Sequence, residues 1–182
     1  MPPGRGASPP TGRKKGELAL AREALGYSRG GFSTKLHLAF DGRGRPLTIH
    51  LTGGQRHESP QLGAVLDGIR VPRRRGRPRK RPDDLTLDRG YSYRTCRGLL
   101  RRRKLRHVIP ERKDQREARQ KKGARGGRPP RFDRAAYRLR SWAERGVNRL
   151  KQWRAVATRY DKRAVNYLAT VQFAAIMIWL QA

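Results

Sequence analysis

The stretch Tyr137-Arg138-Leu139-Arg140-Ser141-Trp142-Ala143-Glu144-Arg145-Gly146-Val147-Asn148-Arg149-Leu150-Lys151 combines a helical pattern with a row of polar side chains. At about 100° per residue, Arg140, Glu144 and Lys151 fall at about −60°, −20° and −40° from Tyr137. These four side chains are therefore predicted to share one narrow stripe of a helix. The apolar residues of the stretch fall mostly on other sides and are expected to form its buried face: Leu139, Trp142, Ala143, Val147 and Leu150.

This stripe has two interpretations. A single carboxylate among cationic donors could hold a metal ion beside a phosphodiester. The alternative is a charged, solvated helix face in a chain rich in Lys and Arg. Two observations favour the first: Arg140 before Glu144 is the less favourable order for an i,i+4 ion pair, and Glu144 and Lys151 are separated by roughly 10 Å along the axis.

The composition points to a polyanionic partner. The 182 residues include 45 Lys and Arg against 14 Asp and Glu, a formal net charge of +31, for which nucleic acid is the best match. The single cysteine, Cys96, excludes an internal disulfide and a cysteine-cluster zinc site. The uncharged run 164–182 barely reaches membrane-spanning length and is interrupted by polar residues, so it is predicted to be a buried core helix.

Apolar alternation and turn residues divide the chain. Residues 1–28 are expected to be a basic disordered or linker segment, and residues 29–182 one domain. Leucine, isoleucine and phenylalanine alternate over 36–40 and 47–51 around a turn at 41–46, which predicts a β-hairpin. Helices and short strands follow in the order β-β-α-β-α-β-α-α, a mixed α/β class. Two basic loops are expected, at 72–82 and 111–134.

A second carboxylate of interest is Asp88, which ends the predicted strand 85–88 and precedes Gly90. Asp-x-Gly at the end of a strand is also a common turn. Asp88 alone therefore fits a turn as well as a functional site, and only the downstream Glu144 favours a pair of metal-binding carboxylates.

Three stretches resemble the DDE transposases of bacterial insertion sequences, in the branch named for its Tyr-Arg-Glu-Lys signature (IS four and IS five-like elements). Arg29-Gly30-Gly31-Phe32-Ser33-Thr34-Lys35-Leu36-His37-Leu38 is similar to the family's second strand. Leu87-Asp88-Arg89-Gly90-Tyr91-Ser92 is similar to the segment with its second catalytic aspartate. The third stretch runs from Tyr137 to Lys162 and resembles the glutamate helix and its sequel.

This resemblance implies an RNase H-like fold for residues 29–182, with the hairpin in a mixed sheet flanked by helices. Asp88 and Glu144 match the second and third catalytic positions and are expected to bind Mg²⁺ or Mn²⁺. Tyr137, Arg140 and Lys151 match the accompanying signature and are expected to contact DNA. The implied activity is metal-dependent cleavage and transfer of double-stranded DNA in the bacterial cytoplasm, in association with the nucleoid and without a membrane partner.

The family's first catalytic aspartate has no counterpart, because residues 1–28 contain no Asp and no recognisable strand. Glu17, Glu23, Asp41 and Glu58 do not match its position. Two metal ions held by two carboxylates would be under-ligated, so this chain alone is expected to be weak or inactive. We expect a C-terminal portion of a transposase that lacks the first strand: the downstream product of a frameshifted gene, acting as a homodimer or with an upstream-frame product, or a truncated remnant.

The loop 72–82 contains Arg-Gly-Arg-Pro, in which Arg75, Arg77 and Arg79 are candidate DNA-binding residues. This sequence resembles an AT-hook, which binds the minor groove of A·T-rich DNA. The alternative, which we favour, is a basic loop that contacts phosphates without sequence preference. For the whole chain, a catalytically inactive DNA-binding remnant and a general nucleic-acid-binding protein remain as alternatives, although the latter does not need Asp88 and Glu144.

Overall fold

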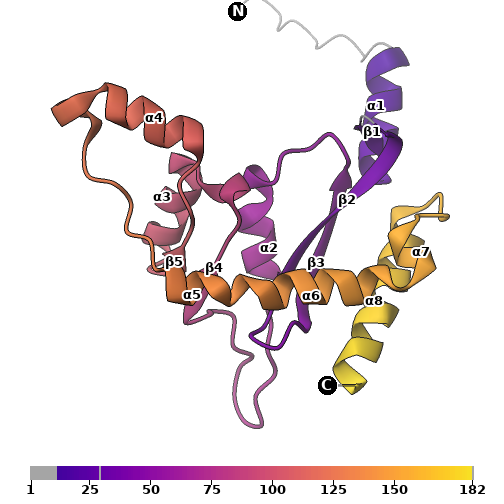
Figure 1. Ribbon diagram of the computed structural model, residues 1–182. Coiled ribbons are helices and arrows are strands. Elements are labelled where there is room, and N and C mark those ends of the chain that lie inside the picture. The colour runs from indigo at the N-terminus through magenta and orange to yellow at the C-terminus, as the bar shows by residue number, and fades with distance from the viewer. Residues whose placement is uncertain (1–11, 29, 182) are drawn as a thin grey trace, which may run out of the picture.

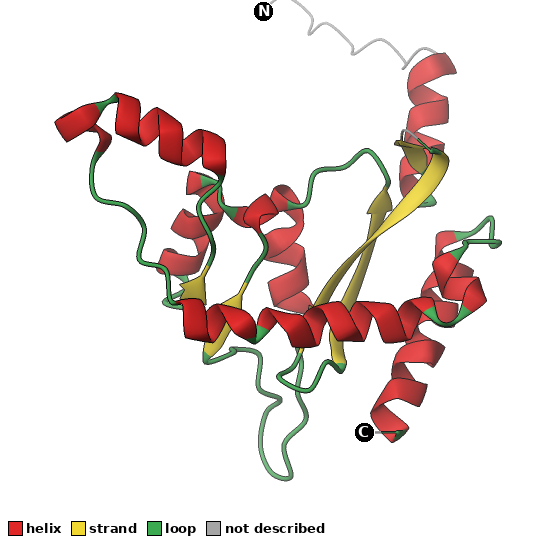
Figure 2. Cartoon of the chain, in the orientation of Figure 1, coloured by secondary structure: helices red, strands yellow, loops and turns green. Residues whose placement is uncertain are grey.

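The computed structural model describes residues 12–28 and 30–181, which form helices around two small sheets (Figures 1 and 2). The predicted order of strands and helices is present within them. The elements are α1 (Gly12–Arg22), β1 (Gly26–Ser28), β2 (Gly31–Phe40), β3 (Pro46–Gly53), η1 (Ser59–Gln61), α2 (Leu62–Gly68), β4 (Asp84–Thr86), η2 (Arg89–Tyr91), α3 (Arg94–Arg102), β5 (Arg106–Val108), α4 (Lys113–Lys121), η3 (Gly123–Gly126), α5 (Arg134–Arg138), α6 (Arg140–Lys151), α7 (Arg154–Ala157) and α8 (Ala164–Leu180), where η marks a 3₁₀ helix.

The strands form two separate sheets. Strands β1, β2 and β3 pair antiparallel in that order, and β4 pairs parallel with β5. Among residues 12–28 and 30–181, no strand joins the two sheets, so the single mixed sheet that was expected is present as two. Strand β1 pairs with β2 only at residues 31–33 of β2. Beyond residue 33, that edge of β2 has no strand partner in the described part of the chain.

The β2–β3 hairpin forms as predicted, but both of its faces are covered rather than one. The alternation read from the sequence fails at Leu47, which the register shift between Ala39 and Phe40 leaves out of the pairing and which packs on the opposite side from Ile49 and Leu51. Leu36, Leu38 and Phe40 pack on a core that Leu150 and helix α8 supply, together with Ile49 and Leu51 of β3. On the other face, Ala39 and Leu47 pack on a second core, built from α2, α3 and the residues around β4 and β5. The hairpin therefore lies between two cores, one of which includes the last turns of α6.

Two glycines allow α6 to cross the β2–β3 turn closely. A Cβ on Gly146 would come within 2.5 Å of the Phe40 ring and 2.6 Å of the Gly44 carbonyl oxygen. A Cβ on Gly44 would come within 2.7 Å of the Trp142 carbonyl oxygen, and Gly44 also has a φ of +75°, which favours glycine. This close contact fixes α6, and with it Glu144, against the hairpin.

Two expected irregular segments contain regular structure. Helix α1 and strand β1 lie within residues 12–28, where a disordered or linker segment without a strand was expected; residues 1–11 lie outside the described residues. Strand β1 is only three residues long, too short to show an apolar alternation. Helix α4 and η3 lie within 111–134, the second predicted loop. Helix α4 buries no residue, so it has no apolar period; good helix formers and exposed ion pairs sustain it instead.

Helix α8 confirms the prediction of a core helix for only one of its faces. That face buries Tyr167, Val171, Ala174 and Ile178, whereas Phe173 and Ile176 on the other face are 57% and 54% exposed. No helix in the described part of the chain is long and apolar enough to cross a membrane. The run is apolar on all sides, and the sequence therefore did not indicate which face would be covered.

Arg159 links the N-terminal segment to the loop that precedes the C-terminal helix α8. Its guanidinium donates to the carbonyl oxygens of Glu23, Asp161 and Lys162, each at 2.8 Å. It also donates to the hydroxyl oxygen of Thr34 in β2 at 2.5 Å. In return, the backbone N–H of Ala164 at the start of α8 donates to the Glu23 carboxylate at 2.6 Å. Glu23 therefore has a structural role in joining these segments.

The buried His37 predicts a stability that depends on pH. Its side chain is 2% exposed, and burial, followed by the positive charges of His50 and Lys35, lowers its pKa from 6.5 to about 4. As pH falls below 6.5, the unfolded chain binds a proton that the folded chain does not, so the free energy of unfolding should fall by about 3 kcal/mol by pH 4. Urea unfolding of wild type and His37→Gln between pH 7.5 and pH 4 measures this. Equal pH slopes in the two proteins would contradict it.

Candidate functional site

Asp88 lies two residues after the end of β4 and is the N-cap residue of η2. Its Oδ1 accepts a hydrogen bond from the backbone N–H of Arg89 at 2.6 Å, which caps the 3₁₀ helix. The turn interpretation of Asp88 is thus correct for one carboxylate oxygen. The other oxygen, Oδ2, lies 3.4 Å from Nη2 of Arg140, which belongs to a helix more than fifty residues later in the chain.

Glu144 lies on α6, and the helix predicted from residue 137 onward is interrupted at one residue. Helix α5 ends at Arg138, Leu139 forms a turn, and α6 begins at Arg140. In Figure 1 the two helices continue in nearly the same direction. The predicted buried face is only partly correct: Leu150 is 1% exposed, but Leu139 and Trp142 are 58% and 37% exposed. The N-terminal half of the motif therefore lies on the surface rather than on the core.

Arg140 connects the two predicted catalytic carboxylates. Its Nη1 donates to Oε1 of Glu144 at 2.5 Å, while its Nη2 pairs with Oδ2 of Asp88. The carboxylate side chains are 53% and 55% exposed, so both remain accessible to a ligand from solvent. The structure thus brings together two residues that the sequence separates widely, and a single guanidinium lies between them.

The other two residues of the stripe are placed differently. The Tyr137 ring centroid lies 6.0 Å from the Arg140 guanidinium carbon, and its ring also packs against Phe132 with centroids 5.2 Å apart. Lys151 is exposed at the last position of α6 and has no ion-pair partner among the described residues. Tyr137 therefore adjoins the carboxylate pair, whereas Lys151 lies two helical turns beyond Glu144.

A third carboxylate reaches the turn that contains Asp88. A Cβ on Gly90 would come within 2.6 Å of Oε2 of Glu58, whose Oε1 pairs with Lys35 at 3.5 Å. Burial raises the pKa of Tyr91 to about 12, and the negative charge of Glu58 is the next largest cause. The charge of Asp88 contributes to the same shift. The sequence could not show this proximity, because Glu58 follows β3 in a turn without any strand pattern.

The donor set fits one Mg²⁺ rather than two. Carboxylate oxygens are the ligands that Mg²⁺ prefers, and it is commonly held by one or two carboxylates together with water and substrate phosphates. Asp88 and Glu144 provide that number. Within residues 12–28 and 30–181, however, no group of three or more His, Cys, Asp or Glu side chains is arranged to hold a metal ion.

The basic loop with Arg75, Arg77 and Arg79 lies apart from this site. It leads into the start of β4, whereas Asp88 follows the end of that strand. Arg79 forms an antiparallel β-bridge with Val71 and an ion pair with Asp83. Figure 1 shows the loop projecting away from α6. The structure therefore does not bring these arginines to the carboxylate pair.

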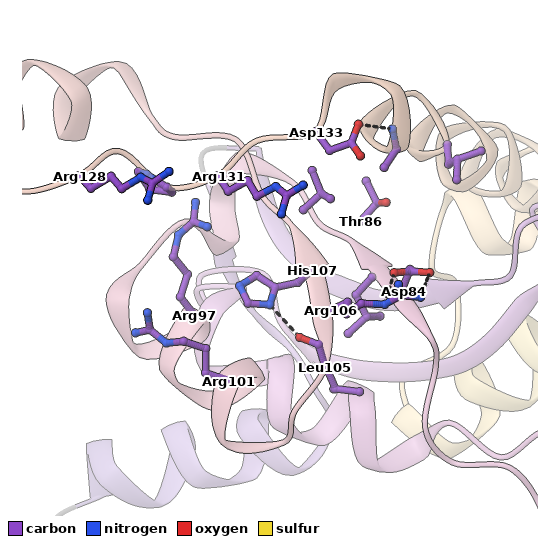
Figure 3. A pocket seen from close by; sticks show the side chains of 15 residues that line it. Asp84, Thr86, Arg97, Arg101, Leu105, Arg106, His107, Arg128, Arg131 and Asp133 are labelled. Atoms are coloured by element: carbon purple, nitrogen blue, oxygen red, sulfur yellow. Dashed lines mark hydrogen bonds and ion pairs between the residues drawn. The ribbon is translucent and has the colours of Figure 1, made fainter.

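Sequence reasoning missed a second group of arginines, which lines a cavity beside β4 (Figure 3). They come from α3, from β5 and from the segment before α5: Arg97, Arg101, Arg106, Arg128 and Arg131. No local motif joins these positions, so the only sequence sign was the general excess of arginine.

Comparisons with known proteins agree with the resemblance. A family model described as "Transposase DDE domain" matches residues 9–179. The chain is 37% identical over 81 residues to the "Putative transposase for insertion sequence element IS402" of Burkholderia cepacia, a match that covers 44% of this chain and 38% of that protein. It is 27% identical over 153 residues to the "Putative transposase for insertion sequence element IS6501" of Brucella ovis, which covers 82% of this chain and 99% of that protein. No solved structure matches the chain. The match along nearly its whole length means that the chain belongs to the family of transposase DDE domains.

Proposed function

We propose that the chain forms part of a catalyst that cleaves and transfers DNA strands in the transposition of a bacterial insertion sequence, in the branch with the Tyr-Arg-Glu-Lys signature. The observation that carries the proposal is the contact of Arg140 with both Asp88 and Glu144. Two carboxylates that far apart in sequence meet at one accessible point on a strongly basic protein. Their substrate is double-stranded DNA at the ends of the element and at its target, within the bacterial nucleoid.

In this proposal, Asp88 and Glu144 hold one Mg²⁺ or Mn²⁺. The ion, when bound, supplies Lewis-acid stabilisation of the phosphodiester and activation of the attacking oxygen. Arg140 pairs with the two carboxylates before the ion and the substrate bind, and then turns to a DNA phosphate, because its planar guanidinium suits phosphate oxygens equally well. Tyr137 and Lys151 contact the same strand on either side along the helix stripe.

The proposed fold is an RNase H-like domain over residues 29–182 that a further strand completes. The two separate sheets and the partly uncovered edge of β2 support this, because a strand beside β2 would extend β1 and join the sheets. That strand would bring the third carboxylate. We propose that it lies outside the described residues, in an upstream-frame product or a second copy of the transposase.

A second candidate function is DNA binding without catalysis. The absence of a three-carboxylate group among the described residues favours it. A nicking assay on supercoiled DNA carrying the element ends separates the two, with the chain alone and with the product of any overlapping upstream frame. The proposal predicts weak or no nicking by the chain alone and Mg²⁺-dependent nicking by the mixture. DNA binding without nicking in either sample would support the inactive remnant instead.

A further inference from the structure

A cavity of about 820 Å³ lies between the β4–β5 sheet, α3 and the segment that leads into α5 (Figure 3). Its floor includes Leu85 and Thr86 of β4 and Val108 of β5. Residues of the 128–139 segment, among them Arg131 and Leu139, line it on another side. The volume falls within the range of about 300–1,000 Å³ that is typical of small-ligand sites.

The charges around this cavity are unbalanced. Of its two carboxylates, Asp84 pairs with Arg106 at 3.0 Å, and Asp133 accepts a hydrogen bond from the backbone N–H of Ala136 at the start of α5. The remaining arginines have no carboxylate within ion-pair distance among the described residues: Arg97, Arg101, Arg128 and Arg131. Arg97 is half-buried, and among the described residues its guanidinium donates a hydrogen bond only to the carbonyl oxygen of Ile109, at 2.8 Å. An anion is therefore the chemical partner that this group lacks.

The cavity combines this cationic lining with apolar and ring surfaces, which suit a nucleobase. Leu85, Val108 and Leu139 present aliphatic atoms, and His107 presents an imidazole that Leu105 holds through its carbonyl oxygen at 3.0 Å. Bases of a duplex are stacked inside it and cannot reach such a wall, whereas an unpaired base can be turned out and packed against it. The site also adjoins the carboxylate pair, because Leu139 immediately precedes Arg140.

We propose that this cavity binds one unpaired nucleotide of a DNA strand, with its phosphate on the arginines and its base against the apolar wall. The position of the nucleotide, next to the phosphodiester that Asp88 and Glu144 act on, rests on the proposed function. The binding itself does not, and it is measured without divalent metal.

The test compares two double variants of the full chain. Arg101→Gln/Arg131→Gln removes two exposed arginines of the cavity, and Arg102→Gln/Arg134→Gln removes two exposed arginines close to them in sequence that do not line it. Binding of a labelled oligothymidylate, of the same strand with one abasic position and of a matching duplex is followed by fluorescence anisotropy in EDTA over a range of salt concentrations. Circular dichroism melting confirms that each variant folds.

The cavity variant is expected to bind the single strand about tenfold more weakly, with a log–log salt slope lower by about 1.4, as the loss of two phosphate contacts predicts. The control variant should show a much smaller loss, and the duplex should be affected little by either. The wild type should also bind the abasic strand more weakly. Equal losses in the two variants, or equal losses for single strand and duplex, would overturn the proposal and leave a general basic surface, whether or not the nicking assay succeeds.

Discussion

Asp88→Asn is expected to lower Mg²⁺-dependent nicking, by the chain mixed with its upstream-frame product, by at least roughly a hundredfold. The loss of a group that only orients a metal ligand already costs about 10- to 100-fold in activity, and Asp88 is proposed to be a ligand itself. The substitution removes the negative charge of the carboxylate that is proposed to bind the metal ion. The amide oxygen of Asn can still accept the hydrogen bond from Arg89 that caps η2. The effect should therefore appear in the rate of nicking and not in the melting temperature.

Asp67→Asn provides the matched control. Asp67 is also an exposed carboxylate paired with an arginine, since its Oδ1 accepts from Nη1 of Arg103 at 2.7 Å, but it lies at the end of α2 outside the site. It should leave nicking unchanged. Comparable nicking by the Asp88→Asn and Asp67→Asn variants would show that Asp88 is not part of the catalytic site.

Arg159→Ala is expected to destabilise the fold by about 4 kcal/mol, because several hydrogen bonds from one charged donor are lost together. These bonds join the end of α1, strand β2 and the loop before α8. Arg159→Lys should recover less than half of the loss, since an ammonium cannot donate along the diverging directions of the guanidinium. Urea unfolding at neutral pH measures both.

Arg163→Ala is the control for this effect. Its side chain is exposed and has no hydrogen-bond or ion-pair partner within the described residues, so it should change stability by less than about 0.5 kcal/mol. If Arg159→Ala is as mild, the N-terminal segment does not depend on Arg159 for its attachment.

The sequence predicted those parts of the fold in which the apolar residues follow a clear pattern. The alternating apolar residues of β2 and β3 predicted the hairpin, and the uncharged apolar run 164–182 predicted helix α8. Helix α4 and strand β1 were missed because the first buries nothing and the second is too short to alternate. The division into two sheets could not be read at all, since strand pairing depends on partners far apart in the chain.

For the candidate site, the sequence indicated which residues to consider but not how they contact one another. Asp88 and Glu144 are candidates because of the helix stripe and the family resemblance, and the structure shows that Arg140 contacts both of them. The Arg140 to Glu144 contact also shows that the i,i+4 pair, which the unfavourable order of charges argued against, does form. Glu58 near Gly90 and the arginines of the cavity were missed because their proximity arises only from tertiary packing.

The most direct test of the account is whether Asp88 and Glu144 hold the same divalent cation. Binding of Mn²⁺ to the DNA-bound protein can be followed by electron paramagnetic resonance for the wild type, Asp88→Asn, Glu144→Gln and the double variant. If the carboxylates share one ion, each single substitution should weaken Mn²⁺ binding nearly as much as the double one, because the interaction is lost once. Losses that simply add, or a double variant that binds Mn²⁺ as tightly as the wild type, would contradict a shared metal site.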